Sequence, residues 1–142
     1  MASDATTTTA YHLPSYVYKI LPSPPPTPLP AALPLSDLDR QDGFIHLSNA
    51  HQVPTTASLF FTAHRSLALL KVDARKTRAQ GGVYRWVEGM PGCPHLYAPR
   101  EGEWIDLGSE NVVDWREVGR EEGQGWEEAL KGLQDEGWLV DE

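Results

Sequence analysis

Short runs of branched and aromatic residues recur along the chain between polar connections that contain glycine or proline, a pattern typical of strands joined by turns. Side chains alternate between the two faces of a strand, so each run divides into two sets of residues. The run at 43–48 has apolar residues on both faces, which predicts a strand inside a sheet. Further strands are predicted at residues 16–21, 66–72, 83–87, 95–97 and 112–115, with 104–107 as a candidate partner beside the last of them.

Helices are predicted in three stretches of the chain. Ser36 is a suitable N-cap for a short helix before the strand at 43–48, and acidic residues in its first turn favour the helix dipole. A second helix, capped by Ser48 or Asn49, is expected to extend as far as His64 because apolar residues recur at helical spacing. A terminal helix with an apolar stripe is expected over residues 126–133.

Three stretches lack an apolar pattern. Residues 1–14 are small and polar and are expected to form a disordered tail, which leaves 15–142 as a single domain. Residues 22–34 contain seven prolines in thirteen positions, a composition that favours an extended loop over a helix or an internal strand. This loop is either a stiff surface connection or a docking segment for a proline-reading module. The basic and polar residues 74–82 are expected to be exposed.

The charge balance argues against a nucleic-acid partner. Acidic residues outnumber basic ones by 20 to 12, and the basic residues form no stripe of the kind that nucleic acid requires. A small nucleotide remains compatible with this balance. Cys93 is the single cysteine, which rules out an internal disulfide and suits a reducing compartment. No signal peptide or membrane span is predicted, so a cytoplasmic protein with no membrane partner is expected.

His46 is the first candidate for function. It is expected to share one face of the 43–48 strand with Phe44 and Ser48. An imidazole at the end of an apolar strand is costly unless it is hydrogen-bonded or faces a cleft. His46 is therefore either a functional group or a core histidine bound to a backbone carbonyl.

A second imidazole is expected near the first. His95 and Tyr97 share a face of the 95–97 strand, and we expect His95 to converge with His46 as a catalytic acid–base pair. The two rings would form the polar end of an otherwise apolar pocket. Hydroxyl groups there would orient a ring or bind a ligand, and a cationic side chain would offset a negative ligand group. The ligand-binding candidates are Tyr18, Lys19, Ser48, Arg85 and Tyr97.

No metal site is predicted. His46 and His95 lack a third obvious ligand, and the spacing of Cys93 and His95 is not that of a zinc site. Nucleophilic catalysis by Ser48 is disfavoured because a serine directly after a strand is more often a helix cap.

Several unusual strings occur together and in order along the chain. Tyr18-Lys19-Ile20 is followed by the string from Asp42 to Ser48, and then by Gln52-Val53, Phe60-Phe61, Leu69-Leu70, Arg85-Trp86 and Pro94-His95-Leu96-Tyr97. In these strings, between residues 16 and 115, the chain resembles the domain-of-unknown-function family DUF952.

The resemblance carries implications for fold and ligand. It implies an α+β fold of the ADP-ribosyltransferase-like kind, in which small, split and curved sheets, mixed but rich in antiparallel pairs, accompany a few short helices. That fold holds a dinucleotide between its sheets, which makes NAD the candidate cofactor. It is most similar to the tRNA 2′-phosphotransferases, and this places His46 and Ser48 on the second strand of the site, with Lys19 near the first.

Two classes of function stay open. The first is a small enzyme of transferase-like or acid–base type that acts on a nucleotide or a small metabolite. The second is a non-catalytic module that binds a ligand or a protein with the same residues, because a likeness of fold does not decide activity. The sequence does not determine the oligomeric state.

Overall fold

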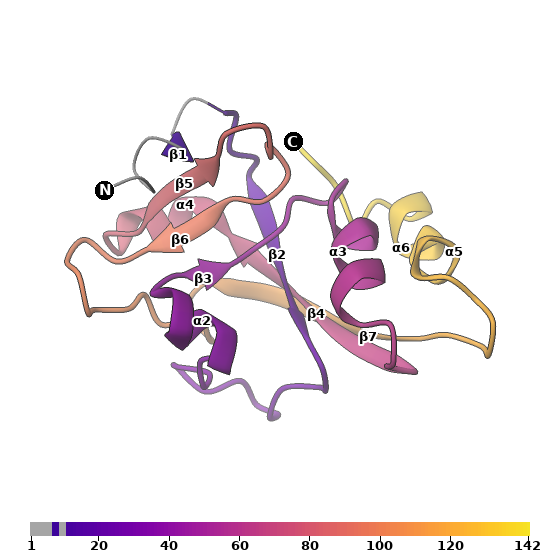
Figure 1. The fold of residues 1–142 in the computed structure, drawn as a ribbon. Helices are drawn as coiled ribbons and strands as arrows, with labels where there is room; N and C mark the ends of the chain where they lie inside the picture. The colour runs from indigo at the N-terminus through magenta and orange to yellow at the C-terminus, as the bar shows by residue number, and fades with distance from the viewer. Residues whose placement is uncertain (1–6, 9–10) are drawn as a thin grey trace.

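The computed structural model describes residues 7–8 and 11–142, which form two small sheets and a few short helices (Figure 1). Among these residues every strand pairing is antiparallel, so the predicted α+β fold with small antiparallel sheets is confirmed. The three-stranded sheet has the order β2 (Tyr16–Leu21), β4 (Ser66–Asp73), β7 (Val112–Gly119). The four-stranded sheet has the order β1 (Thr7–Thr8), β5 (Val83–Val87), β6 (His95–Tyr97), β3 (Ile45–His46).

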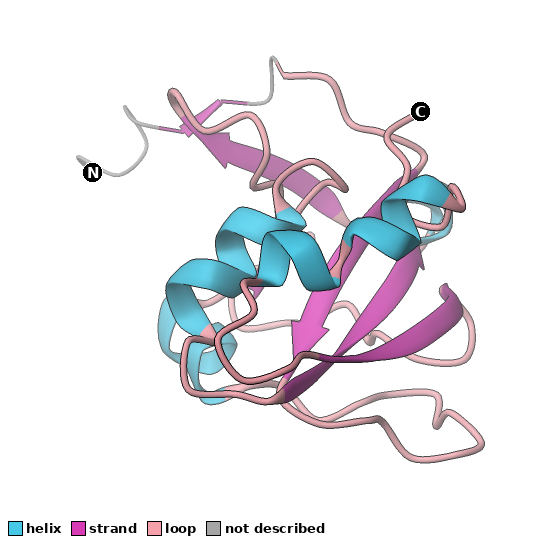
Figure 2. Cartoon of the chain, turned by 90° about the vertical axis from the view of Figure 1, so that its right-hand side faces the viewer, coloured by secondary structure: helices cyan, strands magenta, loops and turns pink. Residues whose placement is uncertain are grey.

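Helices cover one face of the three-stranded sheet. These are α3 (Val53–Phe60), α5 (Trp126–Ala129) and α6 (Lys131–Asp135), and they lie beside β2, β4 and β7 in Figures 1 and 2. Trp126 and Leu130 are fully buried beneath them, as expected for the apolar stripe of the terminal helix. That helix is not continuous as predicted, because the backbone at Leu130 ends α5 and begins α6. Gly137, with a φ of 79°, follows the second helix.

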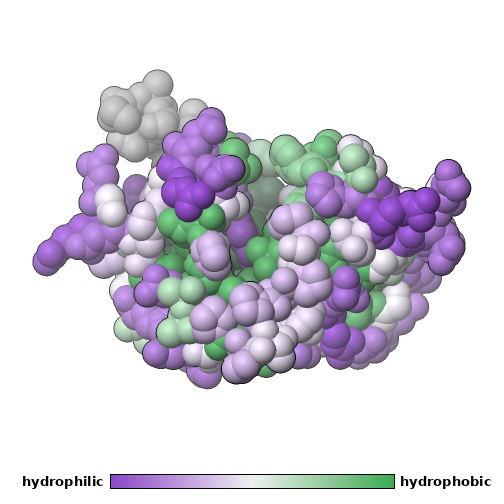
Figure 3. Space-filling view, turned by 90° about the horizontal axis from the view of Figure 1, so that it is seen from below, coloured by the Kyte–Doolittle hydropathy of each residue, from purple (hydrophilic) through white to green (hydrophobic). Residues whose placement is uncertain are grey.

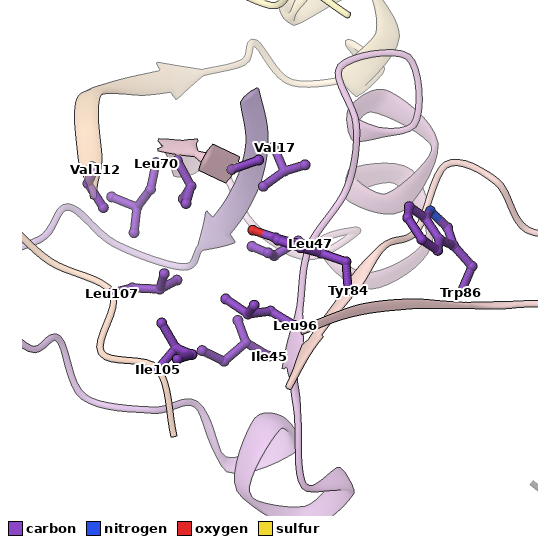
Figure 4. Packing of buried hydrophobic residues seen from close by; sticks show 12 residues of the cluster. Val17, Ile45, Leu47, Leu70, Tyr84, Trp86, Leu96, Ile105, Leu107 and Val112 are labelled. Atoms are coloured by element: carbon purple, nitrogen blue, oxygen red, sulfur yellow. The ribbon is translucent and has the colours of Figure 1, made fainter. Parts of the chain in front are cut away.

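A second core lies between the two sheets (Figure 4). Ile45, Tyr84 and Leu96 point from the four-stranded sheet toward Val17 and Leu70 of the three-stranded sheet. These five side chains are at most 6% exposed, so the inner face of the four-stranded sheet is fully used for packing. Its outer face therefore carries the remaining side chains of β3, β5 and β6.

The segment 74–82 differs from its prediction. It begins with helix α4 (Ala74–Ala79), which Asp73 caps by accepting hydrogen bonds from the backbone of Arg75 and Lys76. Ala74 and Thr77 are buried, and the Thr77 hydroxyl lies 2.8 Å from the Tyr84 hydroxyl. The predicted exposure is confirmed at 75–76 and 78–80 and is wrong at Ala74 and Thr77, because a short helix next to a sheet buries one or two small residues.

The strand predicted at 43–48 is shorter than expected, and the prediction that it lies inside a sheet is wrong, because β3 is the edge strand of the four-stranded sheet. Strand β3 contains Ile45 and His46, and the chain then crosses to the other sheet, where Ser48 and Tyr18 exchange two backbone hydrogen bonds of 2.8 and 2.9 Å. Helix α3 consequently starts later than expected, with Gln52 as its N-cap, and neither Ser48 nor Asn49 caps it. The Asn49 side chain instead accepts a hydrogen bond from the Gln52 N–H at 2.9 Å, in the turn that precedes the helix.

The proline-rich stretch 22–34 contains no helix or strand, as predicted. It lies along residues 107–109, where Leu33 donates to the Leu107 carbonyl at 2.8 Å and Ser109 donates to the Pro30 carbonyl at 2.9 Å. The 104–107 segment is therefore not a strand beside β7 but part of the wall that holds this loop. Gly108 lies between the two contacts, and a Cβ there would overlap the carbonyl oxygens of Pro30 and Ala31.

Part of the predicted N-terminal tail contacts the four-stranded sheet. Thr7–Thr8 pair with Trp86 and Val87 as strand β1. The Tyr11 ring meets the Trp86 ring edge-on at 6.2 Å, and its hydroxyl accepts a hydrogen bond from the Gly89 N–H. The remainder of the predicted tail, residues 1–6 and 9–10, lies outside the described residues.

No helix among the described residues has the length and apolar character needed to cross a membrane. Seen from below, hydrophobic residues occupy separate patches between hydrophilic ones (Figure 3). This face of the molecule therefore shows no continuous apolar surface.

Candidate functional site

The site begins with a chain reversal between helix α2 (Asp37–Asp42) and strand β3. Ser36 caps the helix, as predicted, by accepting a hydrogen bond from the Asp39 N–H at 3.0 Å. Gly43 ends it with a φ of 82°, a left-handed conformation that glycine adopts at little cost. The chain turns back at once, so carboxylates from the helix lie beside the first residues of β3.

His46 is held by two of these carboxylates. Its Nδ1 lies 2.7 Å from Asp39 Oδ1, and its Nε2 lies 2.9 Å from Asp42 Oδ2. The backbone N–H of His46 also donates to Asp39 Oδ1 at 3.1 Å. A carboxylate can only accept, so both ring contacts are hydrogen bonds only when each ring nitrogen carries a proton. The ring is 29% exposed and fixed in orientation.

Asp39 is also paired with a buried lysine from the other sheet. Lys19 Nζ on β2 lies 2.7 Å from Asp39 Oδ2 and donates to the His46 carbonyl at 3.2 Å. Asp39 is 1% exposed and Lys19 is 9% exposed, so the pair is largely removed from water. Burial alone would raise the pKa of Asp39, but the His46 hydrogen bonds and the Lys19 charge outweigh it and hold that pKa below its usual value. Asp39 therefore remains an anion that orients His46.

His95 lies directly opposite His46 in the β3–β6 register, with the ring centroids 5.4 Å apart. The structure thus brings the two predicted imidazoles together. Burial, followed by the nearby His46, lowers the pKa of His95 to about 4. His95 is consequently a neutral imidazole at pH 7, and no described residue forms a hydrogen bond with its ring in the structure.

Aromatic rings pack around the two histidines. Phe44 stacks on His95 with centroids 4.2 Å apart and an interplanar angle of 18°. The same phenyl ring lies 4.5 Å from His46 and 5.0 Å from Tyr97. The rings of Phe44, His46, His95 and Tyr97 therefore form one aromatic cluster on the outer face of the four-stranded sheet.

Arg85 extends this cluster onto β5. It lies opposite His95 in the β5–β6 register, and its guanidinium is 5.3 Å from the centroid of the Tyr97 ring. Arg85 is exposed, and no described carboxylate forms an ion pair with it. His46, His95 and Arg85 thus form a row across three neighbouring strands, which we call the polar row.

Two predicted ligand-binding residues lie elsewhere. Ser48 is buried, with its hydroxyl 3.2 Å from that of Thr56 on α3. Tyr18 is fully buried on β2, where its hydroxyl donates to the Trp138 carbonyl at 2.8 Å and accepts from the Val140 N–H at 3.1 Å. The early end of β3 explains the position of Ser48, which pairs with Tyr18 in the other sheet instead of continuing the face of His46.

Asp39, Asp42 and Phe44 are the site residues that sequence reasoning missed as functional groups. Asp39 is one of the acidic residues expected in the first turn of the helix capped by Ser36, and a favourable position in the helix dipole does not reveal its contact with His46. The available signal was a short helix followed directly by glycine and a strand, because such a reversal brings the last helical turn against the first strand residues.

The polar row lies on an open sheet face. One hollow of about 430 Å³ is formed by residues 62–65 and 120–125, and a narrow slot of about 20 Å³ lies between Lys19, Asp39 and apolar side chains that include Leu33 and Leu107. Neither hollow is lined by His46 or His95. Within residues 7–8 and 11–142, no group of three or more histidine, cysteine or acidic side chains could hold a metal ion.

Fold and site together define a class: an α+β protein with two small antiparallel sheets, one of which carries imidazoles and aromatic rings on its outer face. The chain belongs to a family of proteins of unknown function, DUF952, which matches residues 30–114. The matched range contains the whole polar row together with Asp39 and Asp42.

Solved structures resemble the chain over most of its length. The crystal structure of protein CC0527 from Caulobacter crescentus is 27% identical, with a TM-score of 0.53, and the match covers 75% of this chain and 88% of that one. A double mutant of the same Caulobacter protein matches with the same values. No curated protein matches the chain.

Proposed function

We propose that the protein binds a small anionic ligand, a nucleotide or an acidic metabolite, on the outer face of β3, β6 and β5. The observation that carries this proposal is the polar row, in which His46, His95 and Arg85 follow one another across three strands. Arg85 supplies a cation without an ion-pair partner among the described residues, and neutral His95 supplies one donor and one acceptor. Aromatic rings beside them offer flat surfaces to a base or a sugar.

The face is preorganised for binding. His46 is held by Asp39 and Asp42, and His95 is held by its stacking on Phe44. Fixed groups lose little conformational entropy when a ligand binds, so even an open face can supply useful affinity. The rigid sheet supplies this order without a deep pocket.

NAD is the first ligand to test. The likeness to ADP-ribosyltransferase-like folds, which the family resemblance implied, is an analogy of fold and adds no contact of its own. In this proposal Lys19 does not touch the ligand, because it is buried against Asp39, and it acts by positioning that carboxylate.

Acid–base catalysis is the second candidate, and the contact between Asp39 and His46 favours it. A carboxylate at Nδ1 orients an imidazole and stabilises its protonated form, as in many acid–base sites. In this mechanism neutral His95 accepts a proton from a ligand hydroxyl or water, and the His46 ring, when both of its nitrogens carry a proton, donates one from Nε2 after Asp42 moves aside. The transferase-like alternative uses the same two groups on a nucleotide.

A ligand screen by thermal shift tests the binding proposal. NAD, ADP-ribose, nucleotides and acidic metabolites are added to the wild type, to His46→Ala and to His51→Ala, since a ligand that binds only the folded state raises the melting temperature. His51 is an exposed histidine outside the site and serves as the matched control. We expect one ligand class to stabilise the wild type and His51→Ala but not His46→Ala.

The screen has two informative negative results. If no ligand shifts the wild type, the proposed binding function is wrong. If the shift survives in His46→Ala, the ligand binds elsewhere and the histidine is structural. A ligand that shifts the protein is then incubated with it and the products are separated by chromatography. Formation of a product that depends on His46 and His95 supports catalysis, and unchanged ligand supports a binding module.

A further inference from the structure

The two ends of the polar row differ in charge. At one end, Arg85 is an exposed cation that has no ion-pair partner among the described residues. At the other end, His46 is flanked by the Asp39 and Asp42 carboxylates. The chain therefore separates a positive end from an acceptor-rich end on the same face of the sheet.

The spacing of the row follows from the register. His46 pairs with His95, and His95 pairs with Arg85, so the two ends are two strand spacings apart. Neighbouring strands lie about 4.8 Å apart, which places the ends of the row about 10 Å from one another. This span suits a small elongated molecule better than a single ion.

Asp42 is the accessible acceptor at the second end. Its side chain is 35% exposed and contacts His46 through Oδ2, and none of the described residues forms a hydrogen bond with the other carboxylate oxygen. As the last residue of α2, it faces the unfavourable end of the helix dipole, so helix stability does not explain an aspartate there. Asp42 can accept hydrogen bonds from ligand hydroxyls, whereas it would repel an anion.

We infer that the polar row takes a hydroxylated anion in one orientation, with its phosphate or carboxylate at Arg85 and its hydroxyl groups at Asp42, beside His46. This inference rests on the proposed binding function and specifies the ligand chemistry of that site. The middle of the ligand lies over His95 and Tyr97, where a sugar or base contacts the rings. Arg85 selects for the anion, and Asp42 selects for the hydroxyl groups.

Matched probe pairs test the two ends separately. AMP and adenosine differ by the phosphate, and AMP and its 2′,3′-dideoxy analogue differ by the hydroxyl groups. Ribose 5-phosphate compared with ribose tests whether the base is needed, and gluconate tests a carboxylate in place of the phosphate. Dissociation constants are measured by calorimetry for the wild type and for the Arg85→Gln and Asp42→Asn variants.

We expect each variant to reduce one of the two preferences and to leave the other unchanged. Arg85→Gln should lower the ratio of affinities for the phosphorylated and unphosphorylated probes about tenfold. It should leave the preference for hydroxyl groups unchanged. Asp42→Asn should remove a similar factor, roughly fivefold to tenfold, of the hydroxyl preference and leave the phosphate preference unchanged. The control variants Arg75→Gln and Asp37→Asn remove exposed charges elsewhere and should change neither preference.

Each remaining outcome counts against a stated claim. If a ligand binds in a manner that depends on His46 and the wild type prefers the phosphorylated probe, but the hydroxyl preference is absent or the variants leave both preferences unchanged, this inference fails and the proposed function stands. If the wild type shows neither preference, the inference and the anionic ligand of the proposed function both fail. If both variants reduce all probes equally, the row has no orientation and the inference also fails. If no ligand of any class binds, the proposed function fails and this inference fails with it. Melting curves of each variant exclude loss of folding as the cause.

Discussion

His95 is the residue whose environment makes the clearest prediction about pH. Its pKa is lowered to about 4 from 6.5, mainly by burial and then by the nearby His46. Below pH 6.5 the unfolded chain takes up a proton on this ring that the folded protein does not take up until about pH 4. The free energy of unfolding therefore falls as the pH is lowered through this window, by about 1–2 kcal/mol once the partial exposure of the ring is allowed for.

The His95→Gln variant should lack this contribution. Urea unfolding of the wild type and the variant between pH 7.5 and 4.5 should show a steeper loss of stability for the wild type. His51→Gln, an exposed histidine, should follow the wild-type curve. Parallel curves for the wild type and His95→Gln would show that burial does not hold this ring neutral. Below pH 4 the lowered pKa of Asp39 adds a separate loss, since that carboxylate must then be protonated.

At the same scale, the sequence predicted part of the site and missed the rest for a physical reason. Alternation along strands puts His46 on one face with Phe44, and His95 on one face with Tyr97, and the structure shows that both faces are the outer one because the opposite side of each strand fills the core. The contact of His46 with Asp39 depends instead on the angle at which α2 returns to β3. The alternation of side chains along a strand carries no information about that angle. The contacts of His46 with the carboxylates of α2 are therefore seen only in the structure.

Among the elements, β2 makes a testable connection to the C-terminal segment. The Tyr18 hydroxyl is buried and bonded to the backbone of Trp138 and Val140. Tyr18→Phe should lower the free energy of unfolding by about 1–3 kcal/mol, because it leaves a buried carbonyl and a backbone N–H without their partner. Tyr16→Phe, on the same strand, removes a hydroxyl that forms no hydrogen bond with any described residue, and should change stability by less than about 0.5 kcal/mol.

Chemical denaturation of both variants measures the difference, and equal stabilities would contradict the structural role assigned to the Tyr18 hydroxyl.

The strands themselves were predictable, because β2, β4, β5 and β6 carry strong local patterns of apolar and branched residues. Helix α4, the division between α5 and α6, and the early end of β3 were not. Helix α4 and the early end of β3 depend on contacts outside their own segments, Thr77 with Tyr84 and Ser48 with Tyr18.

For the whole molecule, the Lys19–Asp39 pair is a polar connection between two sheets that otherwise meet through apolar side chains. Lys19 belongs to the three-stranded sheet, whereas Asp39 contacts both backbone and ring of His46 at the edge of the four-stranded sheet. Removing one partner leaves the other charge buried without compensation, which costs about 3–5 kcal/mol. Removing both charges leaves neither ion, and an amide at position 39 can still accept from the His46 N–H.

A double-mutant cycle with Lys19→Met, Asp39→Asn and the combined variant measures this connection. Urea unfolding at pH 7 should show that the combined variant is more stable than the sum of the single losses predicts, by at least about 1–2 kcal/mol. Strictly additive losses would show that the two charges contribute to stability independently of one another. If they are coupled, His46 owes its orientation to a contact that also holds the two sheets together, and the combined variant should lose ligand affinity while it remains folded.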